Sequence, residues 1–290
     1  MNLSIENVSK TYPNGVQALK NVNLKIPRGM FGLLGPNGAG KSSLMRTIAT
    51  LQEPDNGNLV FGDIDILKEQ EELRKILGYL PQEFGVYPKI SAVDLLDYLA
   101  TLKGVTDSKE RKERVLNYLN LTNLSAHKDK SVNTYSGGMK QRFGIAQALI
   151  AQPKLLIVDE PTAGLDPEER LRFYNILSEI GSDVTVILST HIVSDVADLC
   201  QNFAIIDDGQ VLVQTTPKEA LNAIQSKIWS VTIEKKKVSE IETQYKVINT
   251  RFTAGMIAVK IFSDSCPEGF SASEPTLEDY YFAHIKGFLK

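Results

Sequence analysis

The chain has 290 residues and a formal net charge of −3, with 42% hydrophobic and 23% charged residues. This composition is typical of a folded globular protein and excludes disorder as the main state. The small net charge excludes a strong overall attraction to nucleic acid, which we do not expect as a partner. Two cysteines are too few for a disulfide framework, and no stretch approaches the roughly 20 apolar residues that span a bilayer.

Short apolar runs alternate with helical patterns from the N-terminus to about residue 215. This alternation is typical of an α/β domain with a largely parallel sheet, and we assign residues 1–215 to it. An alternating strand is expected at Val22–Ile26. Three further runs are apolar on consecutive positions, as central strands covered on both faces require. They are Phe31–Leu34, Leu155–Val158 and Val184–Leu188.

Residues 91–151 differ from their surroundings, because helical patterns follow one another there without a convincing strand. Ser91 and Asp94 have the spacing of a capping box ahead of one helix, and a second helix is expected at Lys109–Leu119. The mixed charges of residues 109–114 indicate a solvated helix face better than a phosphate-binding patch. We therefore predict a helical subdomain at about 88–151 inside the first domain.

The pattern changes again near residues 215–217, after a strand at Val211–Val213. Thr276 and Asp279 have capping-box spacing before a closing amphipathic helix. Residues 216–290 are therefore predicted to form a small α+β accessory domain. Lys235–Lys237 fits an exposed turn between two of its strands better than a nucleic-acid site. The expected strands are Trp229–Ile233, Tyr245–Phe252 and Met256–Phe262.

The first motif that carries chemistry follows the strand Phe31–Leu34 directly and opens a helix. Its glycines let consecutive N–H groups curl around phosphate oxygens, and the helix N-terminus adds partial positive charge. Lys41 supplies a full charge for the β- and γ-phosphates, and the Ser42 hydroxyl is placed to ligate Mg²⁺. The strand and helix around the motif favour a P-loop over a chance match. The expected loop residues are Gly35, Pro36, Asn37, Gly38, Ala39, Gly40, Lys41, Ser42 and Ser43.

A second motif ends the strand Leu155–Val158 with two acids, Asp159 and Glu160. By itself this is a strand that finishes in a polar turn. Beside a P-loop, an acid at a strand end holds the magnesium shell, and a second carboxylate orients or deprotonates water. We assign Asp159 to the metal and Glu160 to the water.

A third motif, Ser136, Gly137 and Gly138, precedes a helix that carries Phe143 and Leu149. Without other context it is a helix N-cap and no more. It is also a second anion site, because a hydroxyl, free N–H groups and a helix dipole point to one place.

These motifs together resemble the ATP-binding subunit of an ABC transporter over about residues 1–215. Ser136–Gly138 is similar to the centre of the family's signature motif, although Tyr135 and Met139 replace the usual Leu and Gln. Residues 139–142 and 274–279 resemble the exporter branch. The remaining matches are Gln82 with the Q-loop, Ala163–Asp166 with the D-loop, His191 with the switch histidine and Tyr12 with the aromatic residue on adenine.

The resemblance implies that ATP and Mg²⁺ are bound, with Ser42, Gln82 and Asp159 around the metal. The catalytic residues would be Glu160, His191, Lys41 and Gln82. Asp166 would both contact the nucleotide and cap the helix that follows it. The family arrangement implies a head-to-tail dimer with a second copy or a paralogous subunit. It also implies integral membrane permease subunits, contacted through Glu83–Leu102, that hold the protein at the cytoplasmic face of the cell membrane.

Two other functions fit the same motifs. One is a cytosolic ABC protein that uses the nucleotide clamp as a binding switch on ribosomes or DNA, without transport. The other is an importer subunit, which differs only in its permease and in its C-terminal appendage. Relatives of the first kind usually carry two ATP-binding domains or a long coiled-coil insertion, and this sequence has neither. An exporter ATPase is therefore the leading hypothesis.

Overall fold

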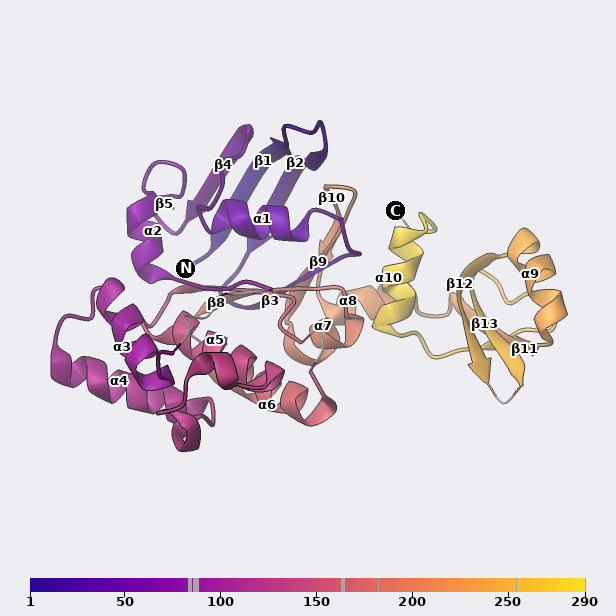
Figure 1. The fold of residues 1–290 in the computed structure, drawn as a ribbon. Helices are drawn as coiled ribbons and strands as arrows, with labels where there is room; N and C mark the ends of the chain where they lie inside the picture. The colour runs from indigo at the N-terminus through magenta and orange to yellow at the C-terminus, as the bar shows by residue number, and fades with distance from the viewer. Residues whose placement is uncertain (83–84, 86–88, 163–164, 182, 254, 290) are drawn as a thin grey trace.

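A computed structural model describes residues 1–82, 85, 89–162, 165–181, 183–253 and 255–289. Within these ranges no helix is long and apolar enough to cross a membrane. The chain forms three sheets with helices around them (Figure 1). The sequence-based prediction of an α/β fold is confirmed.

The first sheet is antiparallel, with the strand order β2-β1-β4-β5. The expected strand at Val22–Ile26 is the second half of β2. The other strands of this sheet were not predicted, because polar residues interrupt their alternation and β1 carries register shifts. The strands are β1 (Leu3–Thr11), β2 (Gln17–Ile26), β4 (Asn56–Phe61) and β5 (Ile64–Asp65).

The second sheet has the order β10-β9-β3-β8-β7-β6, and all of its neighbouring pairs except β10 with β9 are parallel. The three continuously apolar runs become β3, β8 and β7, which lie side by side inside this sheet as predicted. Every residue in these three strands is buried. The strands are β3 (Gly29–Leu34), β6 (Leu77–Leu80), β7 (Leu155–Asp159), β8 (Thr185–Thr190), β9 (Asn202–Asp207) and β10 (Gln210–Thr215).

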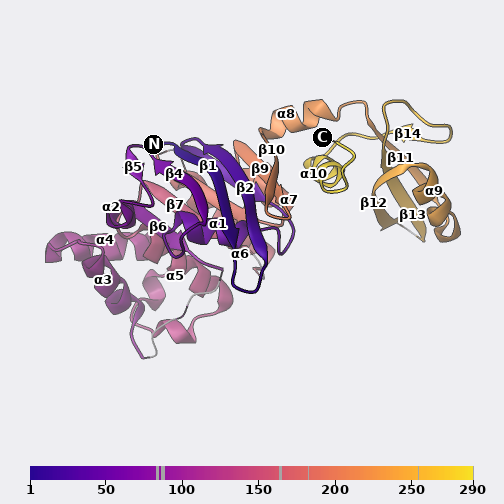
Figure 2. The same ribbon diagram turned by 90° about the horizontal axis from the view of Figure 1, so that it is seen from above.

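Helices cover both faces of the second sheet (Figures 1 and 2). On one face, α1 packs between the two sheets and shares an apolar core with them. On the other face, α5, α6 and α7 form the larger core of the molecule. The helices of this half are α1 (Lys41–Ile48), α2 (Gln70–Ile76), α5 (Gly137–Leu149), α6 (Pro167–Ile180) and α7 (Val193–Leu199).

The region predicted as a helical insertion contains α3 (Ala92–Leu102), α4 (Ser108–Leu121) and two short 3-10 turns before α5. Ser91 caps α3, because its hydroxyl accepts the Asp94 N–H at 3.2 Å. These helices share a separate apolar core around Phe143, which is completely buried. The extent of this subdomain, 88–151, remains our proposal.

The C-terminal part forms the third sheet, with the order β12-β13-β11-β14. All three strands expected here are present, and the Lys235–Lys237 segment is an exposed 3-10 turn. The helices α8 and α9 were not predicted. The elements are α8 (Pro217–Ala223), β11 (Ile228–Ile233), α9 (Val238–Gln244), β12 (Lys246–Thr253), β13 (Met256–Phe262), β14 (Ser271–Ala272) and α10 (Leu277–Ile285).

The last helix, α10, packs against α7 of the first predicted domain (residues 1–215) and against α8 (Figure 1). Its capping box at Thr276 and Asp279 is present as expected. The Tyr280 ring meets Phe203 of β9 edge to face at 6.3 Å. We propose 216–290 as an accessory domain, although α10 contributes to the larger core of the first domain.

Replacement of Phe143 by Ala removes a large, completely buried aromatic side chain from the core of the helical region. The loss of buried apolar surface and the cavity left behind should lower the free energy of unfolding by about 3–5 kcal/mol. Phe252→Ala is the matched control, because Phe252 is 72% exposed and its loss should change stability by less than about 0.5 kcal/mol. Urea unfolding of both variants measures the difference, and equal midpoints would contradict the packing described for Phe143.

Candidate functional site

The predicted site residues come together because β3, β8 and β7 are adjacent and parallel. Parallel strands end at the same edge of a sheet, and here Leu34 pairs with Thr190, and Asp159 with Ser189. The loop after β3, the acids after β7 and His191 after β8 therefore emerge at one edge. This edge carries the candidate site.

The loop between β3 and α1 depends on glycine where the backbone is closely packed. A Cβ on Gly35 would lie 2.2 Å from the carbonyl oxygen of Ile206, and one on Gly40 would lie 2.5 Å from that of Ala18. Gly40 also has a φ of +103°, which side chains disfavour. Helix α1 begins with no capping side chain and no acidic residue in its first turn. Such an N-terminus suits an anion.

Lys41 lies at the start of α1 and is only 5% exposed. Its ammonium group donates to the carbonyl oxygens of Gly35 at 2.7 Å and Pro36 at 3.0 Å. It also forms an ion pair with Glu160 Oε1 at 3.2 Å. The carbonyl oxygens of the loop thus hold the Lys41 ammonium group in place. The oxygens of a bound phosphate would replace them as its partners.

Glu160 is the residue that joins the three strand ends, and it is only 6% exposed. One carboxylate oxygen faces Lys41, and the other contacts Nδ1 of His191. Its backbone has a φ of +50°, and its N–H donates to the carbonyl oxygen of Ser189 at 2.9 Å. This turn directs the carboxylate into the site. The His191 side chain is 42% exposed and lies on the open side of the contact.

Asp159 ends β7 and is 3% exposed. Burial raises the pKa of its carboxyl group, while hydrogen bonding by the hydroxyls of Ser189 and Ser42 acts to lower it. Its Oδ1 atom has no hydrogen-bond partner in the described part of the chain. A buried, under-satisfied carboxylate oxygen beside a serine hydroxyl is a suitable position for a hard cation.

A cavity of about 430 Å³ lies over these groups and has Tyr12 at its wall. The Tyr12 hydroxyl shares a hydrogen bond of 3.0 Å with Ser43 and donates to Gln52, also at 3.0 Å. Several predicted site residues in the described ranges are not part of the lining, namely Gly35, Pro36, Ala39, Ser136–Gly138, Asp159, Asp166 and His191. The lining consists of Tyr12, Val16, Gln17, Ala18, Asn37, Gly38, Gly40, Lys41, Ser42, Ser43, Gln82, Glu160, Asp208 and Gly209.

The predicted signature residues lie at the start of α5. Ser136 caps this helix by accepting the Met139 N–H at 3.2 Å. The unusual Tyr135 is buried in the helical core, where its hydroxyl donates to the carbonyl oxygen of His127 at 2.8 Å. Since Tyr135 points into this core, its substitution leaves the exposed Ser136 and Gly137 and the half-buried Gly138 in place.

The N-cap role predicted for Asp166 is confirmed, because its carboxylate accepts the Glu169 N–H at 2.8 Å at the start of α6. Ala163 and Gly164 of the predicted D-loop lie outside the described residues. So do Glu83, Phe84, Val86 and Tyr87, which belong to the segment predicted to contact a permease.

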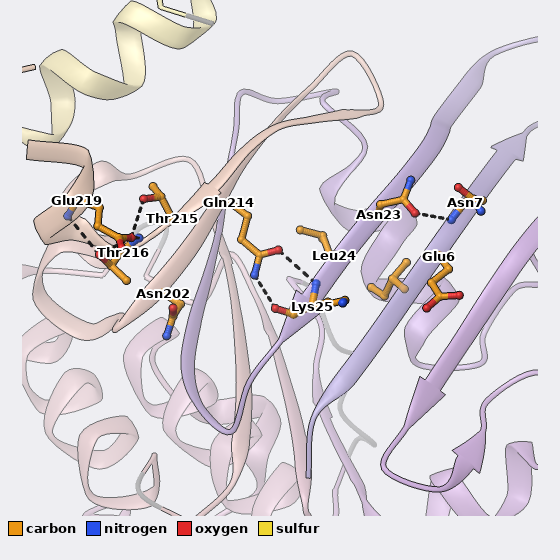
Figure 3. Close-up of a pocket in the computed structure, with 11 residues that line it drawn as sticks. Glu6, Asn7, Asn23, Leu24, Lys25, Asn202, Gln214, Thr215, Thr216 and Glu219 are labelled. Carbon is orange, nitrogen blue, oxygen red and sulfur yellow. Dashed lines mark hydrogen bonds between the residues drawn. The ribbon is translucent and has the colours of Figure 1, made fainter. Parts of the chain in front are cut away.

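A second and larger cavity, of about 740 Å³, lies between the first sheet and β10 (Figure 3). Gln214 crosses it and bonds to the backbone of Lys25, receiving the N–H at 3.2 Å and donating to the carbonyl oxygen at 2.5 Å. This side chain replaces a backbone partner and ties β10 to β2. The cavity contains none of the predicted site residues, so we assign it a structural role.

One residue near the site was missed by the sequence analysis. Asp195 of α7 is completely buried and accepts hydrogen bonds from Thr162, which follows Glu160, and from Thr190, which precedes His191. No local motif signals this residue, because its partners come from other elements.

The phosphate loop, the paired acids and the strand order define a P-loop ATPase. The profile of the ABC transporter family matches residues 19–163. The chain is 38% identical over 214 residues to the linearmycin resistance ATP-binding protein LnrL of Bacillus subtilis, covering 72% of this chain and 68% of that protein. The chain therefore belongs to the ABC transporter ATP-binding family and is the ATPase subunit of a transporter.

Two further relatives differ in the transport that their names describe. The daunorubicin/doxorubicin resistance ATP-binding protein DrrA of Streptomyces peucetius is 32% identical over 262 residues, covering 89% of this chain and 77% of its own. The methionine import ATP-binding protein MetN 1 of Burkholderia lata is 37% identical over 220 residues, covering 72% of this chain and 64% of its own.

Solved structures of ATP-binding cassettes match the fold. The dimeric post-hydrolysis structure of MJ0796 with ADP and Pi has a TM-score of 0.68 and 29% identity, covering 74% of this chain and 98% of that chain. The structure of cbiO1 from Clostridium perfringens, part of the ABC transporter complex cbiONQ, has a TM-score of 0.69 and 29% identity. It covers 83% of this chain and 94% of its own.

Tyr12 offers a direct test of the cavity as the ATP site. If its ring stacks on adenine, Tyr12→Ala should weaken ATP binding by about 1–3 kcal/mol, or roughly 5- to 150-fold. Tyr12→Phe keeps the ring and loses only the hydroxyl contacts, so its ATP affinity should stay close to that of the unchanged protein. Equilibrium binding of ATP measures both, and equal affinities for the Ala and Phe variants would exclude stacking.

Proposed function

We propose that two ATPase subunits form a head-to-tail dimer whose ATP hydrolysis drives substrate export through a separate membrane permease. The observation that carries this proposal is the buried carboxylate of Glu160, held between Lys41 and His191 at the mouth of the phosphate-loop cavity. A carboxylate at that point is near both the phosphate-binding cation and an exposed imidazole.

In this proposal the loop Gly35–Ser43 holds the triphosphate, and Lys41 exchanges its present partners for phosphate oxygens. The Ser42 hydroxyl, the Gln82 amide oxygen and the Asp159 carboxylate would hold Mg²⁺. They are the hard oxygen ligands that this ion prefers, and Asp159 Oδ1 lacks a hydrogen-bond partner in the described structure. When bound, the ion neutralises charge that develops on the phosphate oxygens.

Glu160 is proposed to orient and deprotonate the attacking water, while His191 contacts the γ-phosphate. A general base must lie within hydrogen-bond reach of the water and remain ionised. The Lys41 ammonium pairs with one carboxylate oxygen of Glu160, and the contact with His191 fixes the direction of the other. The two side chains can therefore act together at one end of the triphosphate.

The proposed dimer explains why Ser136–Gly138 do not line the cavity of their own chain. Their backbone N–H groups at the start of α5 would face the triphosphate held by the partner subunit, which is a second copy or a paralogue. Asp166 would approach the same interface from the start of α6. The dimeric MJ0796 structure supports this arrangement.

Replacement of Glu160 by Gln keeps the size and shape of the side chain but removes its charge and the base. ATP binding should persist, while kcat for ATP hydrolysis should fall by about 10²- to 10⁴-fold. Phosphate release and equilibrium ATP binding measure the two effects separately. Hydrolysis at the unchanged rate would refute the role proposed for Glu160.

A groove beside α3 supports the proposal of a permease partner. It has a volume of about 310 Å³ and lies between the end of α1, the strand β6 and α3. Leu51 and Leu102 border it and are 62% and 65% exposed. Exposed large apolar side chains that border a groove are typical of a protein contact. We propose that a helix of the permease occupies this groove and holds the subunit at the cytoplasmic face of the membrane.

The charge-introducing substitution Leu102→Asp tests the groove. Burial of an unpaired carboxylate in the contact should weaken association with the co-expressed permease by at least about tenfold. Phe252→Asp, at an equally exposed position on β12, should leave association unchanged. Co-purification from detergent measures it, with ATP binding as the control for folding. Equal recovery of permease with both variants would exclude this groove.

Export is favoured by the relatives whose names describe drug resistance. The match to DrrA extends over 89% of the chain, and thus into the C-terminal region, whereas the match to the methionine import protein covers 72%. The permease that co-purifies with the protein identifies the transporter. Drug accumulation in cells that lack this permease tests the direction of transport.

A further inference from the structure

The strongest unassigned feature of the molecule is the carboxylate of Asp195, on the helix that follows His191. It is 0% exposed. A buried carboxylate is stable only when cations or hydrogen-bond donors surround it. Asp195 has such donors from three other parts of the chain, and each of them lies close to the catalytic edge.

One oxygen of Asp195 joins the two loops that carry the proposed catalytic pair. Its Oδ2 atom accepts the Thr162 hydroxyl at 2.7 Å and the Thr190 hydroxyl at 2.8 Å. Thr162 lies two residues after Glu160, and Thr190 directly precedes His191. The Thr190 hydroxyl also accepts the Ile192 N–H at 3.0 Å, so it closes a turn around His191.

The other oxygen of Asp195 is held by α6. Arg170 and the Tyr174 hydroxyl both donate to Oδ1, and Arg170 also donates to Ser194 at 2.8 Å. Burial and the hydrogen bond with Asp195 raise the pKa of Tyr174, whose hydroxyl is a donor to this carboxylate. Helix α6 therefore holds one carboxylate oxygen of Asp195, while the other oxygen accepts from the two threonines.

We propose that Asp195 is a positioning residue that holds the loops of Glu160 and His191 together, so that the two side chains meet in the site. This inference rests on the proposed function and adds a residue to it. Asp195 touches neither Glu160 nor His191, and it acts through the threonine beside each of them. A displacement of about 1 Å in such a pair costs on the order of 10²-fold in rate.

The first test is Asp195→Asn in the full chain, with kcat and ATP affinity measured separately. Loss of positioning should lower kcat by about 10- to 100-fold, while ATP affinity stays within about threefold because the phosphate loop is untouched. The control is Asp279→Asn. Asp279 is also 0% exposed and accepts from Lys260 at 2.8 Å, but it lies in the C-terminal region. It should reduce thermal stability and leave kcat unchanged.

Two gentler variants keep the inference testable if Asp195→Asn does not fold. Thr162→Val and Thr190→Val each remove one hydroxyl and keep the side-chain shape, so each should lower kcat without weakening ATP binding. Thr190→Ser keeps the hydroxyl and should recover most of the rate lost in Thr190→Val. A purely structural role would lower stability in all of these variants without this pattern in kcat.

The results separate this inference from the proposed function. Unchanged kcat in both valine variants would overturn the role of Asp195 alone, provided that Glu160→Gln still abolishes turnover. Full turnover by Glu160→Gln would overturn the proposed function and the positioning role that depends on it. A fall in kcat that matches the loss of stability, and that Asp279→Asn also shows, would assign Asp195 to folding only.

Discussion

A carboxylate is tolerated inside a protein only where cations or hydrogen-bond donors compensate for lost water. Glu160 meets this requirement through Lys41 on one oxygen and His191 on the other. These residues follow three neighbouring strands, so their contact exists only because β3, β8 and β7 are adjacent in that order. The order of these strands therefore determines the geometry of the site. A change in that order would separate Lys41, Glu160 and His191.

Two buried carboxylates near this edge have different surroundings. Glu160 faces a cavity, and its neighbours Lys41 and His191 can exchange partners with a bound phosphate. Asp195 is enclosed on all sides by threonine, tyrosine and arginine donors. One carboxylate thus borders the cavity, and the other is enclosed by donors. The proposed proton acceptor would therefore stand on a rigid frame.

The three central strands of the second sheet and the candidate site motifs could be predicted from the sequence because their signals are local, whereas β6 and β9 were not predicted. The runs that became β3, β7 and β8 are apolar at consecutive positions, and the phosphate loop is contiguous. The first sheet was largely missed, since its strands are half-polar and bulged. Asp195 was missed for a different reason. Its donors lie between 5 and 33 residues away along the chain, and no single segment contains the pattern.

The packing of α10 against α7 and β9 has a consequence for the evolution of this subunit. The helix covers Phe203 and Val196 with Tyr280, Tyr281 and Leu277, so these residues form one continuous core. A shortened chain that ended at residue 215 would expose this apolar surface to water. The C-terminal region of this chain could then be lost or exchanged only together with a replacement cover for this surface.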